Sequence, residues 1–253
     1  MRRPPSRDFS YAFGPGPLSP AIKALVIANV AMFVLVNFLL PAGISADIVN
    51  VLGLRPSDIT QHARVWQLAT YMFLHGGVAH ILFNMLALWM FGTELERLWG
   101  TRAFVRYFFA TGIAAAATTI IVALLPFAST GRMFGSVTIG ASGAIYGLLL
   151  AYGLTFPNRP IYIYFVFPIP AKYFVMIMGG IALLSSIGDS GGGIAHITHL
   201  GGLVAGYALL RGRRLSPANE VRYRFLRWKM DRARKKFGVY SGGRKDDWDK
   251  HVH

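Results

Sequence analysis

The stretch Ile139–Phe156 reads IGASGAIYGLLLAYGLTF, eighteen residues without a single charge. An apolar segment of this length crosses a bilayer when its helix is buried or the membrane is locally thin. Over all 253 residues, 54% are hydrophobic and only 15% are charged, against about one quarter in an average soluble domain. So much apolar surface cannot be hidden inside one water-soluble globule of this size, and the sequence therefore predicts a membrane protein.

Five further apolar runs have the same character, which brings the number of predicted spans to six. They are Ile22–Leu40, Val78–Phe91, Phe104–Phe127, Tyr173–Ile187 and Ile194–Leu210. The predicted fold class is an all-α polytopic membrane protein, a bundle of six transmembrane helices. The predicted organisation is a cytoplasmic leader at residues 1–20, the membrane domain at 21–211 and a basic cytoplasmic tail at 212–253. We interpret the leader as retained, because no small-residue cleavage site follows a short apolar core.

Positive charge is concentrated on one side of this predicted bundle. Six spans put both chain ends on the same side, and all but three of the 26 Lys and Arg residues fall there. The three exceptions are Arg55, Arg64 and Arg132. The positive-inside rule makes the richer side cytoplasmic, and the predicted location is a bacterial inner membrane. Membrane topology thus accounts for the net charge of +15. The predicted partner is therefore the lipid bilayer, and nucleic acid is not a predicted partner.

The basic tail has two interpretations. Residues 220–237 have the pattern of one basic helix, which either lies on an anionic inner leaflet or is a solvated segment whose charge only enforces topology. The apolar external loop Pro41–Gly77, with Trp66 and Tyr71, is expected to lie in the membrane interface or to pack on the bundle.

Polar side chains inside predicted spans are the candidates for chemistry, because they are costly there and mark functional sites. They are His80, Asn84, Ser142, His196 and His199. The chain has no cysteine, which excludes disulfides, thiolate metal sites and a cysteine nucleophile.

Small residues four apart predict which spans meet, because they let two helices approach closely. Such pairs are Gly143 and Gly147 in the fourth span and Gly202 and Gly206 in the sixth. If these glycine faces pack together, Ser142 lies beside His199. His196 lies one turn nearer the external loop, and we interpret it as a structural residue or one at the mouth of the site.

A Ser–His pair is the minimal arrangement for nucleophilic acyl transfer. A neutral imidazole takes the hydroxyl proton and later returns it to the leaving amine. The tetrahedral intermediate needs hydrogen-bond donors around its oxyanion. His80 and Asn84 can donate and, being four residues apart, share one helix face. The predicted spans offer no Asp or Glu to orient the imidazole, so the pair would act as a dyad.

Three motifs resemble those of the rhomboid family of intramembrane serine proteases. They are His80-Ile81-Leu82-Phe83-Asn84, Gly140-Ala141-Ser142-Gly143 and His199-Leu200-Gly201-Gly202-Leu203-Val204-Ala205-Gly206. Each lies in a different span, and they follow the family's order. The resemblance implies a rhomboid-like six-helix bundle in which Ser142 is the nucleophile and His199 its base. It also implies an oxyanion site made by His80, Asn84 and the Ser142 backbone N–H.

The same resemblance implies roles for several supporting residues, and the chain differs from the family at one position. It implies that Tyr146 stacks on the catalytic imidazole and that Glu96 is a structural acidic position, with the glycines of the motifs as supports. Gln67 stands where many members have an Arg, which leaves the hydrogen bonding of that Arg unassigned here. The implied activity is cleavage of transmembrane protein substrates within or near their spans, without a metal or another cofactor.

Two alternatives stay open. A catalytically inactive relative would act as a membrane-protein chaperone, but such relatives typically lack the Ser or the His that this chain keeps. A His-based metal-dependent membrane protein would use four histidines as ligands, but the chain has no HExxH motif. Those four are His75, His80, His196 and His199. Judged alone, His75 is interpreted as structural.

Overall fold

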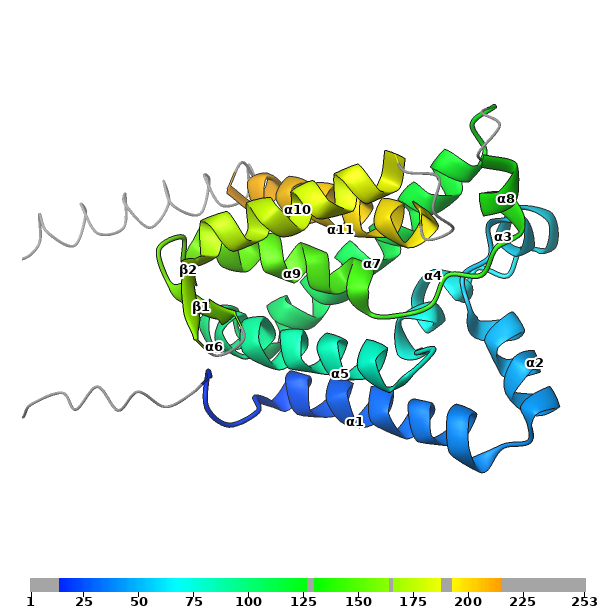
Figure 1. The fold of residues 1–253 in the computed structure, drawn as a ribbon, viewed down its shortest axis with the longest axis horizontal. Coiled ribbons are helices and arrows are strands. Elements are labelled where there is room, and N and C mark those ends of the chain that lie inside the picture. Colours follow the sequence, from blue (N-terminus) through cyan, green and yellow to red (C-terminus); the bar gives the residue numbers. More distant parts are fainter. Residues whose placement is uncertain (1–13, 127–129, 164–165, 188–192, 215–253) are drawn as a thin grey trace, which may run out of the picture. The chain divides into compact units, whose positions relative to one another are not determined.

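The computed structural model describes residues 14–126, 130–163, 166–187 and 193–214, and these are mostly helical (Figure 1). Contacts divide the chain into two units, Met1–Leu210 and Arg211–His253. Of the second unit the structure describes only residues 211–214, the end of the last helix. The predicted helix at 220–237 and most of the predicted tail therefore lie outside the described residues.

The first span consists of α1 (Pro20–Val34) followed by a π-helical turn, η1 (Leu35–Leu39). The carboxylate of Glu96 holds its beginning. It accepts hydrogen bonds from the backbone N–H groups of Ala21 at 3.0 Å and Ile22 at 3.2 Å, and from the Ser19 hydroxyl. The first N–H groups of a helix have no partner within it, and the helix dipole favours negative charge there. Glu96 therefore caps α1 from another span.

The second span is longer than the sequence predicted. One continuous helix over Val78–Trp99 is made of α5 (Val78–Ala87), the π-helical turn η3 (Leu88–Gly92) and α6 (Thr93–Trp99). The sequence predicted the end of this span at Phe91, but the helix continues to Trp99 and the turn comes at Gly100, which has a φ of +80°. The charged residues remain helical because Glu96 is buried against α1 and also accepts from the Thr101 hydroxyl at 2.8 Å.

The rest of the bundle follows in chain order after Gly100. The elements are α7 (Thr101–Ala123), α8 (Thr130–Gly135), α9 (Ser142–Thr155), β1 (Pro160–Ile163), β2 (Phe167–Pro170), α10 (Ala171–Ile187) and α11 (Gly193–Arg214). Most residues of α9 are buried, so this helix lies within the bundle, packed against α7 and α10. Figure 1 shows α10 and α11 along the same side of α9.

Three helices are long and apolar enough to cross a membrane, and they are Pro20–Leu39, Val78–Trp99 and Thr101–Ala123. The apolar helices α9 and α10 are shorter. The predicted all-α membrane fold is confirmed, and six predicted spans are compatible with these helices. The fourth span begins as a helix only at Ser142, because the chain before it is extended. There Leu54 and Thr138 exchange backbone hydrogen bonds, and the Gly140 N–H donates to the Tyr71 carbonyl at 2.9 Å.

The long loop before the second span is folded into short helices. They are α2 (Ala42–Leu52), α3 (Pro56–His62), α4 (Gln67–Thr70) and the 3₁₀ turn η2 (Tyr71–Phe73). As expected for a loop that packs on the bundle, Tyr71 is fully buried. Trp66 remains 46% exposed, with its indole N–H donating to the Val51 carbonyl at 2.9 Å.

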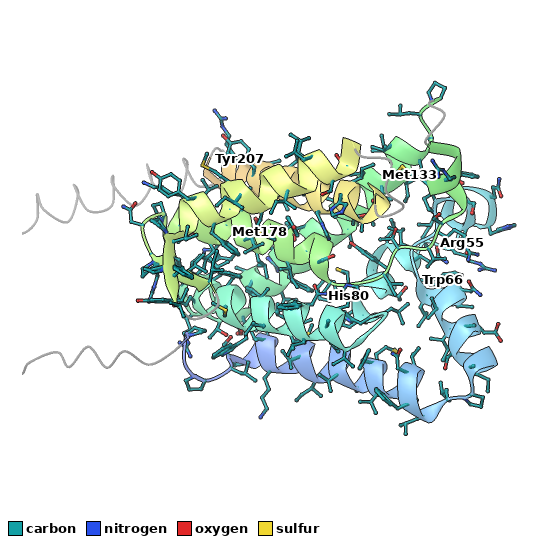
Figure 2. The ribbon with its side chains drawn as sticks, viewed as in Figure 1. Arg55, Trp66, His80, Met133, Met178 and Tyr207 are labelled. Carbon is teal, nitrogen blue, oxygen red and sulfur yellow. The ribbon has the colours of Figure 1, made fainter. Side chains whose placement is uncertain are left out.

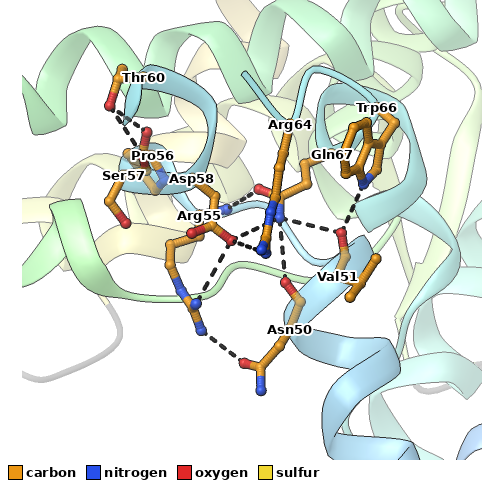
Figure 3. A network of polar contacts seen from close by, with 10 residues as sticks. All are labelled: Asn50, Val51, Arg55, Pro56, Ser57, Asp58, Thr60, Arg64, Trp66 and Gln67. Atoms are coloured by element: carbon orange, nitrogen blue, oxygen red, sulfur yellow. Dashed lines mark hydrogen bonds and ion pairs between the residues drawn. The ribbon is translucent and has the colours of Figure 1, made fainter. Parts of the chain in front are cut away.

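Gln67 is the centre of a polar network that holds these short helices together (Figure 3). The side chain is fully buried; its oxygen accepts from the Arg55 backbone N–H at 3.0 Å, and its amide nitrogen donates to the Asp58 carboxylate at 3.1 Å. The same carboxylate pairs with Arg64 at 3.0 Å. The residue that departs from the family pattern is therefore fully hydrogen-bonded, and Arg64 brings a cation to this network.

A short β-hairpin was not predicted. Strands β1 and β2 pair antiparallel between α9 and α10, with Ile161 opposite Ile169 and Ile163 opposite Phe167. The sequence predicted only a connection between the span that ends at Phe156 and the one that begins at Tyr173, because runs of four residues rich in proline give no clear strand signal.

Candidate active site

Ser142 and His199 are in direct contact. Ser142 is the first residue of α9, and His199 lies in the second turn of α11, 57 residues further along the chain. The Nε2 atom of His199 lies 2.7 Å from the Ser142 Oγ atom, the usual distance for a hydrogen bond that involves a hydroxyl. Both residues are half-buried. The structure thus brings together the two residues that the sequence singled out as nucleophile and base.

Glycines on α11 allow this contact by letting its backbone touch α9. A Cβ atom on Gly202 would collide with the carbonyl oxygen of Gly143. A Cβ atom on Gly206 would lie only 3.0 Å from the Cα atom of Gly147. The close approach predicted between the fourth and sixth spans is therefore present, with Gly202 over Gly143 and Gly206 over Gly147.

The glycines on α9 have a different role from the one predicted. We expected them to face α11, but their open positions face mainly α7. A Cβ atom on Gly147 would lie 2.7 Å from the Thr111 side chain, and one on Gly143 would lie 2.9 Å from the Ala115 Cβ atom. The reason is that α9 is enclosed: α7 occupies the space beside its glycines, while α11 packs against its exposed backbone carbonyls.

Two rings surround the His199 imidazole. The Tyr146 ring, one turn along α9 from Ser142, stacks on it with centroids 4.2 Å apart and planes 5° from parallel. The His196 ring stands at 81° to it, with centroids 5.7 Å apart. Among the described residues, neither His196 Nδ1 nor His199 Nδ1 has a hydrogen-bond partner. Within the described part of the chain, no carboxylate therefore binds the imidazole from the side opposite Ser142.

The His80 ring lies against the backbone that leads into α9, and Figure 2 shows it at the start of α5. Gly140 has a φ of +118°, and a Cβ atom there would lie 2.6 Å from His80 Nε2 and 3.8 Å from Ser142 Oγ. A side chain at Gly140 would therefore be strained and would displace the His80 ring. The Gly76 N–H donates to His80 Nδ1 at 3.5 Å, which leaves the ring proton on Nε2, the nitrogen nearest Gly140.

Asn84 lies one turn after His80 on the same helix, as the spacing predicted. It is buried, and its amide nitrogen donates to the His80 carbonyl at 2.8 Å. This bond turns the amide toward the end of α5 that carries His80.

His75 is the residue whose surroundings the sequence did not predict. The residue is 4% exposed, and its ring stands edge-on to the His80 ring with centroids 4.9 Å apart. Burial, together with the neighbouring His80, lowers the pKa of His75 to about 4, so the ring is neutral near pH 7. The four histidines form two pairs, and the described residues contain no group of three His, Asp or Glu placed to bind one metal ion.

Two further contacts position the site but were not found from the sequence. The Tyr71 hydroxyl donates to the Gly112 carbonyl at 2.8 Å, which fixes the backbone that binds Gly140. The Thr198 and Thr119 hydroxyls lie 2.7 Å apart and join α11 to α7 beside His199. The sequence could have indicated the second contact, because Thr198 is a polar residue within a predicted span, directly before the predicted base.

The fold and the site define a helical, multi-pass membrane protein that holds a Ser–His pair between its buried helix α9 and helix α11. Comparison with known protein families makes the class specific. Residues 62–214 match the rhomboid domain, and the chain belongs to the rhomboid family.

Several known proteins are similar to this chain. The Rhomboid protease GluP of Bacillus subtilis is 29% identical over 183 residues, which cover 70% of this chain and 32% of that protein. Rhomboid protein 1, mitochondrial, of Saccharomyces cerevisiae is 32% identical over 149 residues, covering 58% of this chain and 41% of that protein. RHOMBOID-like protein 1 of Arabidopsis thaliana is 29% identical over 221 residues, which cover 74% of this chain and 51% of that protein. The chain thus spans only part of the length of each of these relatives.

Proposed function

We propose that this chain is an intramembrane serine endopeptidase that cleaves transmembrane proteins with a Ser142–His199 dyad. The observation that carries the proposal is the 2.7 Å contact between His199 Nε2 and Ser142 Oγ. The Tyr146 ring and the glycine contact between α9 and α11 support it, since they hold the imidazole at the hydroxyl.

The reaction follows from this contact. Ser142 Oγ attacks the carbonyl carbon of the scissile peptide bond while His199 Nε2 accepts the hydroxyl proton. The same imidazole then gives that proton to the leaving amine nitrogen, the C–N bond breaks, and an acyl ester on Ser142 remains. A water molecule, deprotonated by His199, attacks the ester carbon and releases the new carboxyl end together with the free Ser142 hydroxyl.

The tetrahedral intermediates carry a negative oxygen that needs donors, and we propose three groups to supply them. Ser142 opens α9, so its backbone N–H is among those without a helical acceptor, at the positive end of the helix dipole. The proton on His80 Nε2 is the second donor, because Nδ1 already accepts from Gly76. Asn84 is the third, one turn behind His80. Donors arranged around the developing charge are the largest single contribution in many acyl-transfer enzymes.

The substrate class follows from the position of the dyad among apolar helices. A peptide bond in a transmembrane helix is hydrogen-bonded and shielded, so the substrate has to unwind before attack. We expect substrates with helix-weakening residues near one end of their span and small residues before the cut. The charge distribution supports cytoplasmic termini, which places Ser142 near the external end of its span, and we propose a bacterial inner membrane as the location.

An activity probe separates this proposal from the two alternatives. A fluorophosphonate should label the purified protein, Ser142→Ala should abolish the label, and a metal chelator should have no effect. Chelator-sensitive activity together with bound metal would favour the His-based metal protein. Absence of labelling in a folded, monodisperse sample would favour the inactive chaperone and contradict the dyad.

A further inference from the structure

The hairpin of β1 and β2 is apolar on both faces. Its strands read PIYI and FPIP, so all eight residues are Pro, Ile, Tyr or Phe. An antiparallel hairpin that faces water on one side normally alternates apolar with polar residues. Here Tyr162 and Phe167 are 44% and 63% exposed, and Val166, beside the turn, is 65% exposed. Neither face of the hairpin has the composition of a surface in water.

The open edges of the hairpin have few hydrogen-bond donors. Ile161 pairs with Ile169 and Ile163 with Phe167, and the ladder continues with the Ala171 N–H donating to the Arg159 carbonyl at 2.9 Å. In such a ladder the alternate residues direct their N–H groups outward. These four are Pro160, Tyr162, Pro168 and Pro170. Three of them are prolines and have no N–H, so Tyr162 alone among the strand residues presents one to the edge. In the apolar part of a membrane no water is available to bind a free backbone N–H group, so such a group must be hydrogen-bonded within the protein or be absent, as in proline.

The length of α10 places the hairpin at the membrane surface. This apolar helix of 17 residues begins directly after β2 and is about 26 Å long at 1.5 Å per residue. A bilayer hydrocarbon core is about 30 Å thick, so a hairpin joined to this helix lies close to the boundary between acyl chains and headgroups. The exposed apolar surface also continues from the hairpin along α10, through Tyr173 at 51% and Met176 at 69%.

A cation lies beside this apolar surface. Lys172, the second residue of α10, has its ammonium 5.0 Å from the centre of the Tyr173 ring. Lysines next to interfacial aromatic rings extend their charge to the lipid phosphates while their stems stay in apolar surroundings.

From these observations we propose that the β1–β2 hairpin is a membrane anchor. It inserts into the interfacial layer of the bilayer at the end of α9 opposite Ser142, and Lys172 binds the phosphates of anionic lipids there. The anchor fixes the depth of α9 and α10 and, because it depends only on the protein being in a membrane, it is independent of the proposed peptidase activity.

Labels at single cysteines test the depth of the hairpin, and the chain has no native cysteine to remove. Spin labels at Phe167→Cys and Val166→Cys are compared in bilayers of phosphatidylcholine and phosphatidylglycerol. The references are Ile181→Cys, exposed on α10, and Gln61→Cys, exposed on the polar helix α3. We expect both hairpin labels to be relaxed more by oxygen than by a water-soluble nickel chelate, as at Ile181. Relaxation like that at Gln61, or protection from both reagents by a covering protein, would overturn the proposal.

Matched variants test the chemistry of the contact. With the label at position 166, Phe167→Asp should move the label toward water, and Phe167→Leu should leave it in place. Lys172→Gln should move the label outward only in bilayers that contain phosphatidylglycerol, while Lys172→Arg should retain its depth. Equal depth for Lys172→Gln and the unsubstituted lysine in both bilayers would contradict the binding of anionic lipid. Unchanged depth with Phe167→Asp would contradict insertion of the hairpin itself.

Discussion

The Tyr146 ring lies flat against the His199 imidazole, with centroids 4.2 Å apart and planes 5° from parallel. Because both Tyr146 and Ser142 belong to α9, one short helix supplies the hydroxyl and the surface on which the partner imidazole rests. The orientation of His199 is therefore supported by the same helix that carries the hydroxyl it would activate.

Removing this ring should impair turnover more than removing its hydroxyl. No hydrogen bond holds the Tyr146 hydroxyl within the described residues, so Tyr146→Phe should keep near wild-type turnover. Tyr146→Leu should lower it by about tenfold, since an aromatic pair contributes about 0.5–1.5 kcal/mol beyond burial. Initial rates on one single-span substrate compare the variants. Equal rates for the Phe and Leu variants would show that stacking does not orient the imidazole.

The two neighbouring histidines should differ sharply. His199 contacts Ser142, whereas His196 stands edge-on to the His199 ring. His199→Ala should therefore eliminate both turnover and fluorophosphonate labelling. His196→Ala should change turnover by less than about tenfold, roughly 1.4 kcal/mol in barrier. The reverse pattern would move the base one turn outward and contradict the Ser142–His199 assignment.

The two side chains of the proposed oxyanion site should contribute separately. His80→Ala and Asn84→Ala should each lower kcat, by about 10²–10³ for a strong donor. His75→Ala serves as the neighbouring control, because it removes a buried ring that contacts His80 but is not one of the proposed oxyanion donors. If kcat is unchanged in both the His80 and the Asn84 variant, these residues only join helices and the oxyanion role is wrong.

The glycine contact between α9 and α11 should be essential for stability. Gly202→Ala places a Cβ atom against the Gly143 carbonyl, and such overpacking costs about 1–3 kcal/mol or separates the helices. Gly180→Ala on α10 is the matched control, because a Cβ atom there meets nothing within 4 Å. Thermal unfolding in detergent should show a lower midpoint only for Gly202→Ala. Equal midpoints would mean that the two helices do not pack as described.

Sequence patterns predicted the parts of this protein that depend on local spacing. The apolar runs predicted the spans, and the repeated glycines predicted that α9 meets α11 and brings Ser142 to His199. They could not predict which neighbour fills the space at Gly147, because Thr111 reaches it from a helix that no local pattern connects with it. Side-chain directions across three helices depend on their packing together.

Other features were missed because their partners are distant in sequence. Glu96 was expected to be a structural acidic position, but nothing in the sequence indicated its partner, which is the start of α1 more than seventy residues away. The Tyr71 carbonyl that binds Gly140 is a backbone group with no sequence signal. The hairpin was taken for a loop, since its prolines suggest irregular backbone when their position on the ladder edges is not known.

Cleavage of a reconstituted single-span substrate tests the central claim most directly. Wild-type protein, Ser142→Ala and Ser142→Cys are placed in proteoliposomes with the substrate, and the products are identified by mass spectrometry. The dyad predicts one or a few cuts within or near the substrate span with wild-type protein, and none with Ser142→Ala at equal expression and thermal midpoint. Near wild-type cleavage by Ser142→Ala would show that Ser142 is not the nucleophile and would contradict the account.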